Sequence, residues 1–218
     1  MKKMNLVLGA ASTALLLAAC NGTDEPSSTE EAGTAFDSIE SQHETIISAA
    51  HNILEQERDL QIHFEEDLAD DANGALTEGS GQVAENVSAR EQYFNEIESA
   101  YAQMESDLST VELVLENGNA EELPSDLEET ASSLADAKSG ISSFISQYSA
   151  NLERHQQYFD GLGSEEADFQ MLADGIETLN DSNVETLPAW DELEEALLTI
   201  EEILADFEMD VEEEEGEE

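Results

Sequence analysis

The spacing of apolar side chains along three long segments constrains the fold most strongly. Over residues 36–68, 83–115 and 127–162, apolar residues recur at alternating steps of three and four. This spacing places them along one face of an α-helix, and its regularity is typical of helices that pack as in coiled coils. Ile47, Leu54 and Leu68 widen the apolar face of the first segment. We therefore predict three helices of about 35 residues, each near 50 Å long.

A few positions of these apolar rows, which we call seams, hold polar side chains. Glu57, Arg90 and Lys138 occupy seam positions in the first, second and third segments. Such residues more often fix the register of packed helices than act on a ligand. His43 and His155 also fall in the seams, where we expect them to be hydrogen-bonded.

Turn-forming residues separate the predicted helices. Asp, Asn and Gly residues within 70–81 interrupt the first segment, and Asn-Gly-Asn at 117–119 ends the second. Residues 125–128, Ser-Asp-Leu-Glu, have the capping-box pattern that begins a helix. Gly161 and Gly163 follow the third segment. The breaks are short enough to join antiparallel neighbours.

A fourth helical segment follows, with seam residues from Phe169 to Phe207. A turn at 161–164, with Ser164 capping the new helix, is favoured over a continuous kinked helix. Pro188 lies within the fourth segment and predicts a kink or a brief break, because proline removes one backbone hydrogen bond and clashes with the preceding turn.

Together these segments predict an all-α fold. It is an elongated antiparallel bundle of three to four long helices with coiled-coil-like heptad packing, placed at residues 35–208. The acidic run at 209–218 is expected to be a disordered tail.

The first twenty residues have the pattern of a bacterial lipoprotein signal. Two lysines near the start precede an apolar stretch at 6–17, which is too short to span a bilayer about 30 Å thick. A lipobox follows, in which Cys20 is the residue expected to be lipidated: Leu17, Ala18, Ala19 and Cys20. We therefore predict a cleaved signal peptide at 1–19 and a flexible polar tether at 20–34.

The charge of the chain excludes one class of partner. It has 54 Asp and Glu residues against 6 Lys and Arg, with a formal net charge of -48. Binding to nucleic acid requires an excess of basic side chains, so no nucleic-acid partner is expected. The acidic surface is interpreted as adaptation for solubility rather than as a specific site for divalent cations.

The sequence contains little that indicates catalysis. Glu40 and His43 have the Glu-x-x-His spacing of di-iron bundles, but no other histidine repeats it. Catalytic serine motifs and phosphate-binding loops are also missing from the sequence. Cys20 is the only cysteine. We therefore predict no cofactor and no enzymatic activity, with Glu40 and His43 as weak metal candidates.

The overall arrangement resembles a known family. A lipobox ending at Cys20, a short polar tether and long charged helices over about 36–207 resemble the "putative cell-wall-binding lipoproteins" of Gram-positive bacteria. Residues 154–159, Arg-His-Gln-Gln-Tyr-Phe, followed by Phe-Gln-Met-Leu at 169–172, are similar to the third-to-fourth helix region of that family. The resemblance implies a helical surface protein that binds the cell wall.

Two functional hypotheses follow. The first is a non-enzymatic lipoprotein, anchored through acylated Cys20 on the outer face of the cytoplasmic membrane and exposed to the cell wall. It would act as a binding or spacer module for wall polymer or another surface protein. The alternative is a metal-binding or redox bundle centred on His43.

Overall fold

The computed structural model describes residues 27–70, 81–118, 123–164 and 168–215, with side chains up to residue 207. These residues form four long helices and no strand: α1 (Ser28–Ala69), α2 (Gln82–Asn117), α3 (Leu127–Leu162) and α4 (Phe169–Glu215). The predicted all-α bundle is confirmed, with a turn rather than a continuous helix between α3 and α4.

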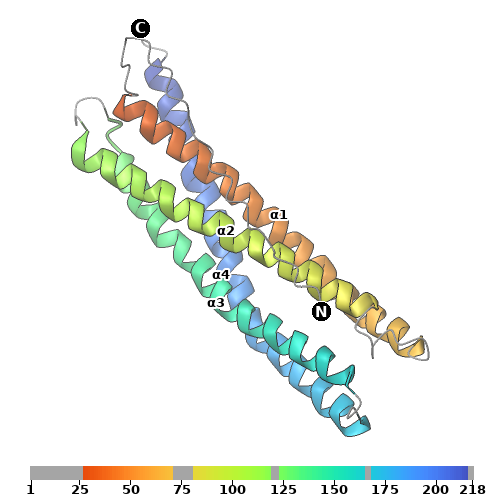
Figure 1. Ribbon diagram of the computed structural model, residues 1–218. Coiled ribbons are helices and arrows are strands. Elements are labelled where there is room, and N and C mark those ends of the chain that lie inside the picture. The colour runs from red at the N-terminus through yellow and green to blue at the C-terminus, as the bar shows by residue number, and fades with distance from the viewer. Residues whose placement is uncertain (1–26, 71–80, 119–122, 165–167, 216–218) are drawn as a thin grey trace, which may run out of the picture.

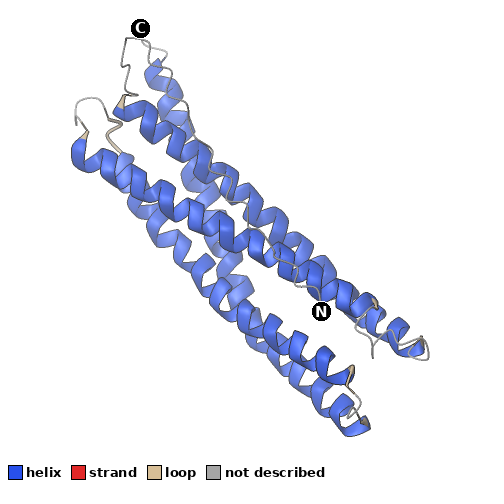
Figure 2. Cartoon of the chain, in the orientation of Figure 1, coloured by secondary structure: helices blue, strands red, loops and turns tan. Residues whose placement is uncertain are grey.

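The helices run alternately up and down in an elongated bundle (Figures 1 and 2). α1 packs along α2 and α3 along α4, while α2 joins these two hairpins by packing on α3. The contact between α1 and α4 is the least extensive of the four. Toward the turns that close the two hairpins, the α1–α2 pair and the α3–α4 pair diverge in Figure 1.

The buried residues follow most of the predicted seams. Large side chains that are almost wholly inaccessible come from all four helices, among them Ile39 in α1, Ile97 in α2, Ile141 in α3 and Leu193 in α4. Three aromatic side chains at the centre pack on Tyr148, with ring centroids 5.2–5.6 Å away: Phe94, Phe144 and Trp190. The regularly spaced apolar side chains therefore pack into one continuous core.

The seam prediction is wrong for the first part of α4. Phe169 is 82% exposed and Ile176 is 43% exposed, whereas the buried positions farther along include Ser182 and Thr186. The physical reason is the divergence of the hairpins, because this part of α4 has α3 as its neighbour and receives little cover from α1. Ile47, Leu54 and Leu68, expected to widen the core face of α1, are also exposed.

The two ends of the predicted bundle differ from the structure. α1 begins at Ser28 and so includes residues 28–34, which were assigned to the flexible tether. A capping box explains the earlier start: Ser27 Oγ accepts from Glu30 N at 3.2 Å, and Ser27 N donates to Glu30 Oε2 at 2.8 Å. At the other end, α4 continues to Glu215 through most of the segment predicted as a disordered tail.

Two other helix starts also differ from expectation. The capping box predicted at 125–128 is not formed, because Asp126 is the N-cap of α3 and its side chain makes no capping hydrogen bond. Ser164 does not cap α4, since its hydroxyl donates to the Gly161 carbonyl at 2.7 Å. Asp168 does so instead, with its carboxylate accepting from Met171 N at 2.8 Å.

Pro188 neither breaks α4 nor ends it, since the helix is continuous from Phe169 to Glu215. Ala189, directly after the proline, is completely buried, and Trp190 packs on the aromatic cluster. This packing directly after the proline compensates for the one backbone hydrogen bond that it removes.

A buried carboxylate joins α1 to α2. Asp67, near the end of α1, accepts hydrogen bonds from Gln82 N at 2.9 Å and Val83 N at 2.8 Å. It thereby satisfies two backbone donors that every helix N-terminus leaves free, and its charge suits the positive end of the helix dipole. Gly81 makes the approach possible, because a Cβ at this position would overlap the Asp67 carboxylate.

The outer surface of the bundle carries nearly all of the acidic side chains. Among the acids whose side chains the structure describes, only Asp67 and Asp107 are buried. The described basic side chains Arg58, Arg90, Lys138 and Arg154 each pair with a single acid. The formal net charge of -48 already counts these basic side chains, so all of it is left uncompensated by them.

We expect this charge to make stability strongly dependent on salt. Salt shortens the Debye length from about 30 Å at 0.01 M to about 3 Å at 1 M, which screens repulsion between exposed acids. A gain of about 2–3 kcal/mol would raise the Tm of a chain of this size by roughly 5–10 °C. Thermal unfolding followed by circular dichroism between 0.01 and 1 M NaCl measures this effect, and a Tm indifferent to salt would contradict it.

Candidate functional site

A cluster of polar side chains draws on all four helices and has its centre inside the bundle. At its centre Arg90 of α2 is completely buried. Its Nη2 lies 3.0 Å from Nδ1 of His155 on α3, and its Nη1 lies 3.7 Å from Oε1 of Glu57 on α1. His155 Nε2 is in turn 3.1 Å from Oδ1 of Asn183 on α4. The Tyr148 hydroxyl lies beside the charges of Glu57 and Arg90. We call these five residues the polar layer.

Burial changes the protonation behaviour of this layer. It raises the pKa of the Glu57 carboxyl, although the nearby Arg90 charge acts in the opposite direction. It lowers the pKa of His155 to about 4, an effect that the Arg90 charge reinforces. The pKa of Tyr148 is also raised by burial, and the negative charge of Glu57 adds to this. His155 is therefore neutral at neutral pH and can accept from the Arg90 guanidinium.

The polar layer continues along the α3–α4 interface. Asn151 Nδ2 donates to Asn183 Oδ1 at 3.3 Å, and the Ser182 hydroxyl donates to Asn151 Oδ1 at 2.6 Å. Arg154 Nη1 donates to Ser182 Oγ at 2.8 Å. These bonds satisfy the hydroxyl of Ser182, which is buried in α4.

The polar layer is incompletely paired. Within the described residues, Arg90 Nε and Nη1, Glu57 Oε1 and the Tyr148 hydroxyl are buried without a hydrogen-bond partner. Buried polar atoms without partners cost stability, so the layer is not the arrangement that maximises it. The layer contains an ion pair between α1 and α2. Its contacts form only when all four helices meet in one register.

We expect the His155 environment to make stability depend on pH. Because the folded-state pKa of about 4 lies below the ordinary value of 6.5, the unfolded chain binds a proton that the folded chain does not. The contribution is fully present above pH 6.5 and falls by about 3 kcal/mol as the pH drops toward 4.

Urea unfolding at pH 7.0 and 4.5 tests this expectation, with His155→Gln as the comparison. Other carboxylates titrate in the same range, and Glu57 acts in the opposite direction because its pKa is raised. The informative quantity is therefore the stability difference between wild type and variant. It should shrink on acidification, and a difference independent of pH would contradict the assignment.

The predicted polar seam residue Lys138 has a different environment. Its side chain is 23% exposed, and Nζ lies 2.6 Å from Glu105 Oε1. Nζ also lies 5.8 Å from the centroid of the Tyr101 ring. The lysine therefore pairs at the edge of the α2–α3 interface rather than within the core.

The weak metal candidates do not converge. His43 is buried, and its Nε2 lies 2.9 Å from the backbone carbonyl of Leu197 in α4. Glu40, one turn earlier on α1, is exposed to solvent. Across the described parts of the chain, no group of three or more His, Cys, Asp or Glu side chains is arranged to hold a metal ion.

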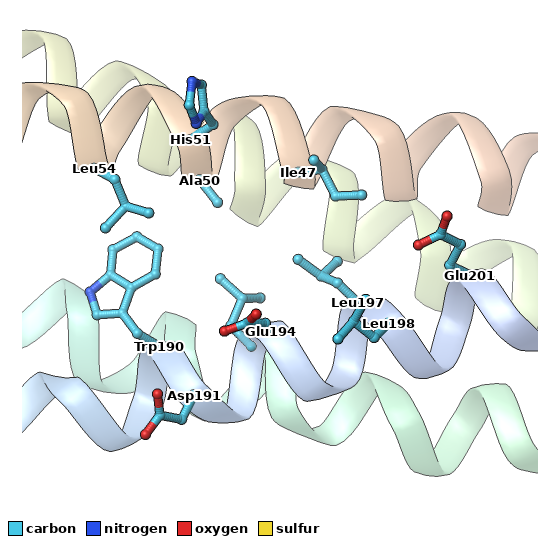
Figure 3. A pocket seen from close by; sticks show the side chains of 11 residues that line it. Ile47, Ala50, His51, Leu54, Trp190, Asp191, Glu194, Leu197, Leu198 and Glu201 are labelled. Carbon is cyan, nitrogen blue, oxygen red and sulfur yellow. The ribbon is translucent and has the colours of Figure 1, made fainter.

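A groove with a volume of about 450 Å³ lies between α1 and α4 (Figure 3). Leu54 of α1 faces Trp190 of α4 at one end, and Ile47 faces Leu197 and Leu198 at the other. From the sequence, Ile47 and Leu54 were expected to widen the apolar face of α1 and so to lie in the core. No sequence signal showed that α1 and α4 would leave this gap.

The predicted lipidation site lies outside the described residues. Leu17, Ala18, Ala19 and Cys20 all precede residue 27, where the description begins. None of the described helices is long and apolar enough to cross a membrane. Attachment through Cys20 therefore stays a prediction from the sequence.

One comparison with known proteins identifies the family. The model of the YkyA family, described as "Putative cell-wall binding lipoprotein", matches residues 27–210, which include nearly all of the described bundle. The chain belongs to this family. No curated protein and no solved structure matches the chain.

Proposed function

We propose that this protein is a lipoprotein held on the outer face of the cytoplasmic membrane by acylated Cys20. There its helical bundle acts as a non-enzymatic binding or spacer module in the cell wall. The observation that carries the proposal is the family match over residues 27–210. The lipobox ending at Cys20 supports the anchoring, because a diacyl chain on a cysteine supplies stable membrane attachment.

The shape of the bundle supports a spacer or binding role. Helices of 36–47 residues extend about 50–70 Å at about 1.5 Å per residue, so the bundle reaches well beyond the lipid headgroups. The described core is devoted to helix packing, and Arg90, Tyr148 and His155 of the polar layer are buried within it. A partner is therefore expected to meet the outer faces of the helices.

The surface charge restricts how wall polymer would be bound. Anionic wall polymer and a chain with a formal charge of -48 repel each other directly. We propose that divalent cations bridge exposed carboxylates to the polymer, or that the bundle binds another surface protein instead.

Sedimentation with purified cell walls tests the binding role. The protein beginning at residue 21 should sediment with walls in millimolar Mg²⁺ and stay in solution when a chelator is added. Sedimentation that disappears after protease treatment of the walls would identify a protein partner. A protein that remains in solution with native walls, with or without Mg²⁺, would contradict wall binding.

A further inference from the structure

We propose that the groove between α1 and α4 is a docking site for a basic amphipathic helix, supplied by a partner protein. The inference concerns a surface that the cell-wall proposal does not use, and it stands whether or not the bundle binds wall polymer. Four observations support it: the gap between the helices, the apolar floor, the acidic border and the length of the groove.

The gap follows from how the bundle is closed. Phe36 and Phe207 stack with ring centroids 4.0 Å apart, and His43 Nε2 lies 2.9 Å from the Leu197 carbonyl. These contacts join α1 to α4 on one side of the groove. Of the four packed helix pairs, α1 and α4 make the least extensive contact. The apolar side chains that face this gap have therefore no partner helix over them.

The floor of the groove is apolar over both helices. Ile47 is 43% exposed, Leu54 is 47% exposed and Leu198 is 55% exposed, and the partly buried Trp190 completes the surface. Large apolar side chains gathered on one exposed surface are a common mark of interaction sites. An aromatic anchor such as Trp190 often contributes strongly to binding of this kind.

The border of the groove sets the charge of the occupant. Asp191, Glu194 and Glu201 of α4 line it, and His51 is the one basic-type side chain among the lining residues. A partner with Lys or Arg beside its apolar face would complement these carboxylates. A second copy of this chain or an anionic polymer would be repelled by the formal charge of -48. Charge complementarity thus favours a basic partner.

The length of the groove suits a helix. Trp190 and Glu201 are eleven positions apart along α4, which corresponds to about 16 Å or three helical turns. An amphipathic helix presents apolar side chains at i, i+4 and i+7 over this distance, the usual way in which a helix fills an apolar groove.

Trp190 provides a direct readout, because it is the only tryptophan in the chain and lines the groove. The probe is a synthetic peptide of about 16 residues without aromatic side chains. It carries Leu at i, i+4, i+7 and i+11, with Lys on both flanks. We expect a saturable blue shift of Trp190 emission as the peptide covers the indole.

Two control peptides separate docking from general attraction to an acidic rod. A scrambled peptide of the same composition, with Leu spread around the helix, should bind at least about tenfold more weakly. A peptide with Glu in place of Lys should also bind at least about tenfold more weakly. Equal affinity of the scrambled peptide, equal affinity of the Glu peptide, or no saturable change in Trp190 emission would each overturn the proposal.

Variants locate the binding on this surface. The double substitution Leu54→Ser and Leu198→Ser should reduce affinity for the Lys peptide about tenfold or more. Leu113→Ser on α2, where Leu113 is 58% exposed, should leave the affinity unchanged. All three sites are exposed, and matching circular dichroism spectra will show that folding is retained. Equal affinities for the groove and control variants would overturn the proposal.

Discussion

Arg90→Ala is expected to lower the free energy of unfolding by about 3–5 kcal/mol. The substitution removes the fully buried cation of an ion pair and leaves the Glu57 carboxylate, 24% exposed, without its partner. It also removes the guanidinium that lies 3.0 Å from His155 and creates a cavity in the middle of the bundle. Urea unfolding followed by circular dichroism measures the change.

Arg58→Ala is the matched control. Arg58 also forms an ion pair, but its side chain is 71% exposed, and its Nε lies 3.3 Å from Oδ1 of the adjacent Asp59. Exposed ion pairs contribute about 0–1 kcal/mol, so this variant should be close to wild type. Equal losses of stability in the two arginine variants would contradict the burial of Arg90 in the polar layer.

A double variant distinguishes the effect of losing the two charges from the effect of losing side-chain volume. Glu57→Leu combined with Arg90→Met removes both charges and keeps apolar volume in the layer. Replacing a buried ion pair by apolar side chains is often neutral or stabilising, so the double variant should be clearly more stable than Arg90→Ala. We expect any cost to appear in the uniqueness of helix register, which NMR line widths report.

Ile97→Asp is expected to destabilise the bundle by about 4 kcal/mol or more. Ile97 is completely buried in α2, and aspartate at this position would place an unpaired charge between packed helices. Thermal and urea unfolding of the purified variant measure the effect, together with near-ultraviolet circular dichroism of the aromatic cluster.

Glu98→Gln is the control at the adjacent position. Glu98 is exposed, and its replacement removes one negative charge from a crowded acidic surface. The variant should match the wild type or be slightly more stable. Similar losses in Ile97→Asp and Glu98→Gln would show that the face assigned to the core of α2 is wrong.

The helices were predictable because their information is local. Apolar spacing in three segments marked faces that the structure buries, including Ile97 and Ile141. The ends of α2 also agreed with the sequence, since Gly81 is its N-cap and Gly118 its C-cap. The start of α1 was missed because residues 28–34 have no large apolar side chain, although Ala32 is buried there.

The features that the sequence did not predict correctly depend on how the helices pack against one another. Phe169 and Ile176 fit the seam spacing of α4, but a seam is buried only where a neighbouring helix covers it. Sequence placed Glu57 and Arg90 in seams but gave no indication that His155 and Asn183 would join them in one layer. Such contacts join residues far apart in the chain, and spacing within one helix does not encode them.

The candidate docking groove was unpredictable for the same reason. Leu54 and Trp190 belong to helices at opposite ends of the chain, and their apolar character alone predicted burial. The family, by contrast, was recognisable from the lipobox and the long charged helices, and the match over 27–210 confirms it.

Anchoring through Cys20 is the central claim, and metabolic labelling with palmitate tests it most directly. Cells would express either the wild-type protein or Cys20→Ala, followed by separation of membrane and soluble fractions. We expect label on the wild type alone, with the wild type in the membrane fraction, because stable attachment requires the acyl chains. Equal labelling of both proteins, or membrane attachment of wild type without label, would contradict the account.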